Sequence, residues 1–108
     1  MKGSIKDLLQ ISGVHGYIIV QGKSMQIKLP SKHKFSGSRD RLWPLYKALT
    51  DGNQRPGNTV EIFLDDMLIT VFLVGSTMLM VLSSLLVNHA LLRMTGKLII
   101  ANMNKEKQ

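Results

Sequence analysis

The chain has 108 residues, of which 44% are hydrophobic and 19% are charged, and its formal net charge is +7. This length predicts one domain with a thin core, and the apolar surplus indicates that a second subunit covers part of the surface. The absence of cysteine excludes disulfides and thiolate metal ligands. The early charges at Lys2, Lys6 and Asp7 argue against a signal peptide, so a cytoplasmic protein is expected.

The first third of the chain predicts a short helix and then a hairpin. Apolar side chains recur at helical spacing over residues 5–11, and residues 16–21 and 24–29 are β-favouring runs separated by a turn at Gly22-Lys23. The second run alternates polar and apolar residues, so its apolar side chains share one face of a strand. The first run is β-favouring without a break and does not alternate, which indicates a more central place in a sheet.

A second helix is expected from about residue 40 to residue 51, after a loop that is rich in Lys, Ser and Gly. Asp40 is the preferred N-cap because Pro44 then lies at the edge of the first turn, where its missing N–H costs little. The helix has one broad apolar side, formed by Leu42, Trp43, Leu45, Tyr46 and Leu49.

The stretch from Met67 to Leu92 has 26 consecutive residues without Lys, Arg, Asp or Glu, and we expect it to be buried. Its length leaves two interpretations open, because a membrane-spanning helix needs about 20 apolar residues. The first interpretation is such a helix. The second is a pair of strands at residues 67–74 and 77–83, preceded by a third strand at residues 60–64.

Three features favour the strands over the membrane span. Residues 69–74 are mostly β-branched or aromatic. Asp65-Asp66 and Gly75-Ser76 are turn signals that divide the stretch into short runs, and polar residues recur through it. Both sides of the last two strands are apolar, which predicts helices on both faces of the sheet or a subunit against one of them.

The chain should end in a helix from about Leu86 to Met103, which completes a single domain of residues 1–103 and leaves residues 104–108 as a disordered tail. Gly96 weakens this helix by about 1 kcal/mol relative to alanine. The predicted apolar stripe of the helix recurs at intervals of four and three residues. It consists of Val87, Leu91, Met94, Leu98 and Ala101.

The predicted order of elements is helix, strand, strand, helix, strand, strand, strand, helix, and in this order the chain resembles the roadblock family, named for dynein light chains. Residues 5–20, IKDLLQISGVHGYIIV, resemble the family opening, in which a short helix reaches a Gly-Val-x-Gly turn and a buried strand. Residues 88–94, NHALLRM, resemble the start of the last family helix, where an Asn precedes a Leu-rich turn and an Arg. The chain departs from the family at residues 83–87, where a short acidic or small-residue link is usual.

The resemblance implies an α/β fold of the roadblock/profilin-like type. Its five-stranded antiparallel sheet has the order 2-1-5-4-3, with the first and last helices on one face and the second helix on the other. It also implies a dimer, either of two copies or with a roadblock-like paralogue, that pairs third strands edge to edge and packs second helices together. In this sequence the dimer contacts would be Val60, Ile62, Leu64, Leu42, Leu45, Tyr46 and Leu49.

Roadblock proteins act as non-enzymatic scaffolds or regulators of Ras-like small GTPases and hold no nucleotide themselves. The resemblance therefore implies a small GTPase or a tethered complex as the partner, and no cofactor. A basic rim on the paired helices would speed association with such a partner. The candidate partner-binding residues are Arg39, Arg41, Trp43 and Lys47.

The residues themselves give little support to catalysis. Neither phosphate-binding pattern, GxxxxGKS/T or GxGxxG, is present, and the HExxH zinc pattern is also missing. The adjacent Asp65 and Asp66 would point to opposite faces of a strand, so a tight turn explains them better. We therefore expect no enzymatic activity and no bound metal.

A basic cluster offers an alternative function. Eight Lys and Arg residues lie between Lys23 and Arg55, where the acidic residues are Asp40 and Asp51. Such clustering predicts attraction to nucleic acid or to an anionic membrane surface. The cluster lacks the interleaved aromatic side chains on which bases stack, which weakens the nucleic-acid interpretation.

Overall fold

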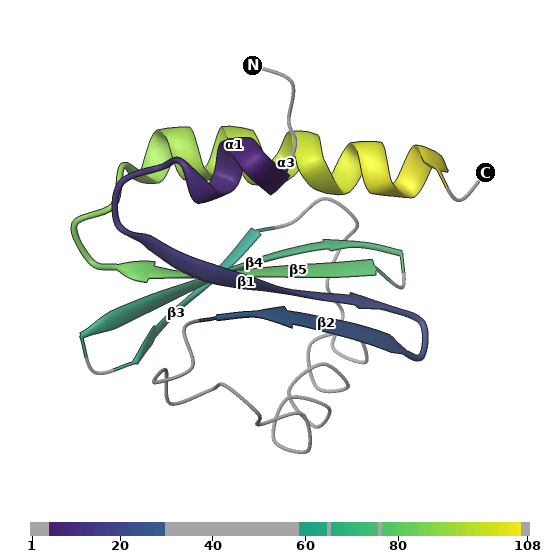
Figure 1. Ribbon diagram of the computed structural model, residues 1–108, viewed down its shortest axis with the longest axis horizontal. Coiled ribbons are helices and arrows are strands. Elements are labelled where there is room, and N and C mark those ends of the chain that lie inside the picture. The colour runs from purple at the N-terminus through teal and green to yellow at the C-terminus, as the bar shows by residue number, and fades with distance from the viewer. Residues whose placement is uncertain (1–4, 30–58, 65, 76, 107–108) are drawn as a thin grey trace.

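The computed structural model describes residues 5–29, 59–64, 66–75 and 77–106, with only the backbone described at Leu64 and at residues 104–106 (Figure 1). The predicted second helix, near residues 40–51, lies outside the described residues. In chain order the elements are α1 (Ile5–Leu9), β1 (Val14–Gln21), β2 (Ser24–Lys28), β3 (Thr59–Leu64), β4 (Met67–Val74), β5 (Thr77–Ser84) and α3 (His89–Glu106).

Tight turns join the strands that are neighbours in sequence. Gly22 between β1 and β2 and Gly75 between β4 and β5 both have a φ of 59°, in the left-handed region that favours glycine. β3 pairs with β4 from Thr59↔Phe72 to Leu64↔Met67. These local hairpins account for each pair of neighbouring strands except one, the pair of β1 with β5.

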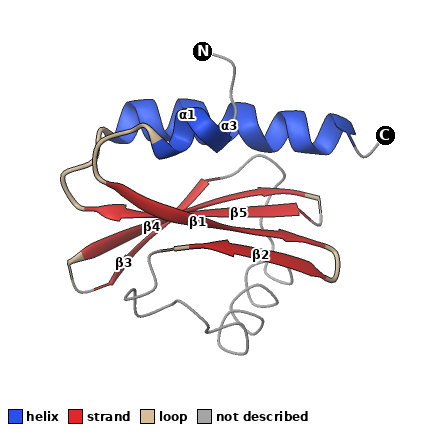
Figure 2. Ribbon diagram, viewed as in Figure 1, coloured by secondary structure: helices blue, strands red, loops and turns tan. Residues whose placement is uncertain are grey.

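β5 is the middle strand of a five-stranded antiparallel sheet in the order β2-β1-β5-β4-β3 (Figure 2). This order confirms the predicted sheet. β1 pairs with β5 from Gln21↔Thr77 to Val14↔Ser83, and the register slips between Gly16 and Val14, so the intervening residue of β1 forms a bulge.

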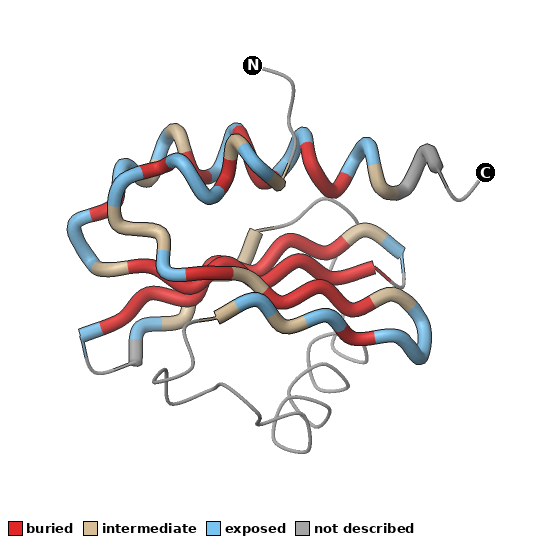
Figure 3. Tube along the Cα trace, in the orientation of Figure 1, coloured by how far each residue is buried: buried red, intermediate tan, exposed pale blue. Residues whose placement is uncertain are grey.

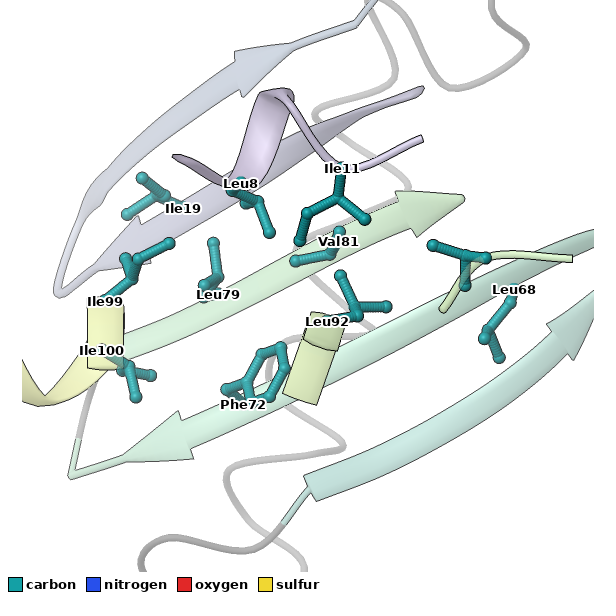
Figure 4. Close-up of a cluster of buried hydrophobic side chains, with 11 residues drawn as sticks. Leu8, Ile11, Ile19, Leu68, Phe72, Leu79, Val81, Leu92, Ile99 and Ile100 are labelled. Atoms are coloured by element: carbon teal, nitrogen blue, oxygen red, sulfur yellow. The ribbon is translucent and has the colours of Figure 1, made fainter. Parts of the chain in front are cut away.

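α1 and α3 pack against each other on one face of the sheet, with α1 against β1 and α3 against β4 and β5 (Figure 1). Their shared core contains Leu8 from α1, Leu92 from α3 and Phe72 from β4, all at most 1% exposed (Figure 4). Burying one such side chain contributes about 1.5–3 kcal/mol. This core explains how the five residues of α1, too few to form a stable helix alone, are held in place.

The second face of the sheet is buried as well, although α1 and α3 both lie on the first face. In Figure 3 the buried residues follow one another along most of β4 and β5. Four methionines, Met25, Met67, Met78 and Met80, lie in the cluster of side chains on this face, and each is at most 4% exposed. Methionine is unbranched and adapts its shape to irregular gaps. β4 and β5 therefore bury side chains on both faces of the sheet, as the apolar residues on both sides of these strands predicted.

The ends of α3 differ from the prediction. The helix begins at His89 rather than near Leu86, because the Asn88 side chain caps it: the backbone N–H of Leu91 donates to Asn88 Oδ1 at 3.1 Å. The helix continues to Glu106, so residues 104–106, expected in the tail, belong to it.

The predicted apolar stripe of α3 is wrong for most of the helix. Val87, just before the helix, is buried and Leu91 packs partly buried against the core, but the other three residues are exposed. Met94 and Leu98 are 50% and 40% exposed, and Ala101 is also exposed. The helix instead buries a stripe of five residues that includes two small or polar ones, Gly96 and Thr95, which conceal it in the sequence. The buried stripe is Leu92, Thr95, Gly96, Ile99 and Ile100.

The long uncharged stretch forms β4, β5, a loop and the start of α3, which confirms the strands over a single long helix. Neither helix in the described part of the chain combines the length and the apolar character that a membrane crossing requires.

Candidate functional site

β3 forms one edge of the sheet. It pairs with β4 along one side, and no strand among the described residues pairs with its other side (Figure 2). An edge strand directs alternate backbone N–H and C=O groups away from its sheet, where a strand of another chain can pair with them. We call this unpaired side of Thr59–Leu64 the β3 edge.

The side chains of β3 alternate between the two faces of the sheet. Val60 and Ile62 are partly buried and pack against the methionine-rich cluster of the second face. Glu61 and Phe63 lie on the face that carries α3, and Phe63 is 66% exposed. The β3 edge thus has aliphatic side chains in contact with the core on one face and an exposed aromatic ring on the other.

Glu61 ties β3 to the beginning of α3. Arg93 Nη2 donates a hydrogen bond to Glu61 Oε1 at 2.6 Å, and His89 Nδ1, charged only if protonated, lies 3.5 Å from Glu61 Oε2. The carboxylate therefore holds the capped end of α3 against the strand that forms the sheet edge. Sequence reasoning missed this contact because Glu61 and Arg93 are 32 residues apart. The one sequence feature that involved this contact was Arg93, the Arg of the NHALLRM fragment.

Glu61→Gln is expected to lower the free energy of unfolding by less than about 1 kcal/mol, because solvent screens an ion pair whose Arg93 side chain is 47% exposed. Urea unfolding of both proteins in low and in high salt measures the difference. The difference should shrink as salt rises. A loss of unfolding free energy well above 1 kcal/mol, or a difference that salt does not change, would contradict the view that solvent screens this ion pair.

The structure describes three of the residues predicted for dimer contacts, Val60, Ile62 and Leu64, and places them on β3. Val60 and Ile62 share one face of this edge strand. The other predicted dimer residues, and the predicted partner-binding residues, lie outside the described part of the chain and their roles stay predictions. They are Leu42, Leu45, Tyr46 and Leu49, and Arg39, Arg41, Trp43 and Lys47.

The structure describes only two members of the basic cluster. Lys23 precedes β2 and Lys28 ends it, and both side chains are exposed. The six other basic residues of the cluster lie outside the described ranges. The joint surface that the alternative function requires therefore stays a prediction.

The chemistry-bearing residues of the described ranges lie on different elements. His15 is in β1, His89 begins α3 beside Glu61, and Asp66 lies in the turn between β3 and β4. Across residues 5–29, 59–64, 66–75 and 77–106, no three His, Asp or Glu side chains gather closely enough to hold a metal ion.

No protein-family model and no curated protein matches this sequence. Several solved structures are similar in fold, among them the following two. The Roadblock/LC7 domain from Streptomyces avermitilis has a TM-score of 0.70 and 16% identity, covering 94% of this chain and 91% of that one. MglC from Myxococcus xanthus has a TM-score of 0.60 and 13% identity, covering 96% and 95%. Both similarities extend over nearly the whole of each chain, so this chain has the roadblock fold.

Proposed function

From the roadblock fold, we propose that this chain is a homodimeric scaffold or regulator that binds a Ras-like small GTPase. The observation that supports the dimer most directly is the β3 edge. It lies at the margin of the sheet, and no strand of the described ranges covers it. Pairing with the same strand of a second copy would extend the sheet across the dimer through a symmetric contact.

The side chains of β3 suit such a contact. Val60 and Ile62 are only partly buried within one chain, although they pack against the methionine-rich cluster. A second copy would complete their burial and would protect an edge that otherwise invites uncontrolled strand pairing. A 44% hydrophobic fraction in so short a chain supports the same conclusion.

The GTPase as partner comes from the resemblance to roadblock proteins. The predicted second helix would add a surface composed of both copies, with Arg39, Arg41, Trp43 and Lys47 as its candidate contacts. Three of these side chains are basic, so they would attract an acidic patch on the partner and raise the association rate.

Ile62→Lys is expected to convert the dimer into a monomer. Pairing of the two β3 edges would bury the introduced charge close to the same charge of the second copy. The matched control is Ile27→Lys. Ile27 lies on β2, the opposite edge of the sheet, and is partly buried against the same methionine-rich cluster. Light scattering after size-exclusion chromatography measures both masses. A monomeric wild type, or equal loss of dimer in both variants, would overturn the β3 dimer.

The GTPase is tested by pull-down with purified Ras-like GTPases in the GDP-bound and GTP-bound states. Binding that prefers one state, is lost in Ile62→Lys and persists in Ile27→Lys would support a surface built from two copies. Equal failure in both nucleotide states would count heavily against a GTPase. Binding instead to random DNA or anionic vesicles, with a steep loss as salt rises, would favour the basic cluster as the functional surface.

A further inference from the structure

The backbone of β3 limits how a second strand can pair with it. Two residues separate Leu64 from its partner Met67, and the residues that flank such a turn form a hydrogen-bonded pair. Hydrogen-bonded pairs alternate along an antiparallel ladder, so the even-numbered residues of β3 bond to β4. The odd-numbered residues, Thr59, Glu61 and Phe63, direct their N–H and C=O groups outward (Figure 2). An antiparallel partner must therefore set its own outward residues opposite these three.

Two copies of β3 can satisfy this rule in two registers that pair five residues of each strand. In the first, Glu61 lies opposite Glu61 of the second copy, which sets two carboxylates against each other at an energetic cost. In the second, Glu61 lies opposite Phe63 of the second copy, and Ile62 lies on the twofold axis opposite itself. The first register would add one hydrogen-bonded pair, so the side chains have to decide between the two.

The second register brings an exposed ring to an ion pair. Phe63 is 66% exposed on the face that carries α3, although its partner on β4, Leu68, is fully buried. Arg93 Nη2 lies 2.6 Å from Glu61 Oε1, and the Arg93 side chain is half-exposed. The Cβ atoms of directly opposite residues lie about 5 Å apart, so the ring of the second copy would reach the guanidinium that Glu61 holds. An aromatic face attracts a guanidinium.

These features make the β3 edge complementary to itself. The ring and the carboxylate that holds the guanidinium are two residues apart on one strand, so a twofold axis through Ile62 would form the contact twice. On the other face of the sheet the same register sets Val60 opposite Leu64 and Ile62 opposite itself, which joins aliphatic side chains. A strand of unrelated sequence could bond to the backbone of β3 but would not match both faces.

We propose that two copies join their β3 edges in the register that sets Glu61 opposite Phe63 of the second copy, with each Phe63 ring packed on Arg93 of the other copy. The inference rests on the proposed homodimer and adds its register and two contact residues, Phe63 and Arg93. Because odd-numbered residues lie opposite odd-numbered residues, the α3 helices of both copies lie on the same face of the joined sheet.

Single cysteines test the register, because the chain has no cysteine of its own. Ile62→Cys should form a disulfide-linked dimer under mild oxidation, since the two copies of residue 62 would face each other. Glu61→Cys should not link, because its two Cα atoms would lie more than about 7 Å apart. Val60→Cys, on the same face as Ile62, is the matched control and should not link either. Electrophoresis without reducing agent measures the covalent dimer.

A second set of variants tests the contact of the ring with the guanidinium. Phe63→Leu should weaken the dimer about tenfold in sedimentation equilibrium, because the contact occurs twice. Arg93→Gln should weaken it by a similar factor, and Phe63→Leu should add little in that background. The matched control is Leu98→Ala, which shortens an exposed side chain of α3 and should leave the dissociation constant unchanged.

The outcomes separate the register from the dimer itself. Linkage of Glu61→Cys in place of Ile62→Cys, or no linkage of any variant in a chain that light scattering shows to be dimeric, would overturn the register while the dimer stands. A covalent Ile62→Cys dimer with an unchanged dissociation constant in Phe63→Leu would overturn the contact with Arg93. A monomeric wild type would overturn the proposed homodimer and the register with it.

Discussion

Gly96→Ala is expected to lower the free energy of unfolding by about 2 kcal/mol, although alanine is the better helix former by about 1 kcal/mol. A Cβ at Gly96 would overlap the Phe72 ring at Cζ and Cε1. The ring is 1% exposed and packed into the core between α3 and the sheet, so it has little room to move. Thermal unfolding should show a midpoint lower by about 10 °C.

Two further variants separate the clash from helix propensity. Asn102→Ala changes an exposed residue of the same helix and should leave stability unchanged or slightly higher. Phe72→Leu shortens the side chain that opposes Gly96, so Gly96→Ala in that background should cost little or even stabilise. If Gly96→Ala stabilised the wild-type chain, the close approach of α3 to β4 would be wrong.

Gly16→Ala should have an effect of similar or greater size, about 3 kcal/mol, because the added Cβ would meet backbone rather than side chain. That Cβ would overlap the carbonyl oxygen of Lys28, and Leu29 Cδ2 would lie 2.8 Å from it. Lys28 pairs with Tyr17 at the end of β2, so the two strands would have to separate there. Urea unfolding measures the loss, and hydrogen exchange should show the end of β2 opening.

The control for Gly16→Ala is Gly22→Asn in the turn of the same hairpin. A Cβ at Gly22 would meet no atom within 4 Å, and asparagine tolerates the positive φ of this position better than most residues. We expect a loss below about 1 kcal/mol there. Equal losses at the two glycines would show that backbone freedom, rather than close approach, decides stability at Gly16.

The strands were predictable because their signals are local. β-branched runs, alternation in β2 and turn glycines such as Gly22 and Gly75 each depend on neighbours in the sequence. The order of the strands required the resemblance to roadblock proteins, since no local signal pairs β1 with β5. The close approaches at Gly16 and Gly96 could not be predicted from the sequence, because the atoms that each glycine contacts come close to it only in the folded structure.

The face of α3 could not be chosen from its sequence. Leu91, Met94 and Leu98 follow a helical repeat as regular as that of Leu92 and Ile99, and hydrophobicity alone does not rank them. Packing against the sheet decides which face is buried. Because Gly96 has no side chain, this side of the helix can contact the Phe72 ring closely, whereas a larger residue would keep the helix farther from the sheet.

The candidate site was predictable only in part. The resemblance named Val60 and Ile62 as dimer residues and implied that their strand lies at an edge of the sheet. The structure places β3 at that edge, and the role of the two residues in a dimer stays a prediction. The contact of Glu61 with Arg93 joins two distant segments through long flexible side chains, for which sequence spacing carries no signal. The roles predicted for residues 39–49 lie outside the described part of the chain.

The central position of β5 bears on how the chain folds during synthesis. β5 lies between the hairpin of β1 with β2 and the hairpin of β3 with β4, so neither hairpin gains its full set of neighbours before residues 77–84 have been made. Until then the growing polypeptide holds apolar strands with open margins, the condition in which nascent chains aggregate or recruit chaperones. Contacts between distant parts of a sequence also slow folding. The five-stranded sheet can therefore be completed only after residues 77–84 have left the ribosome.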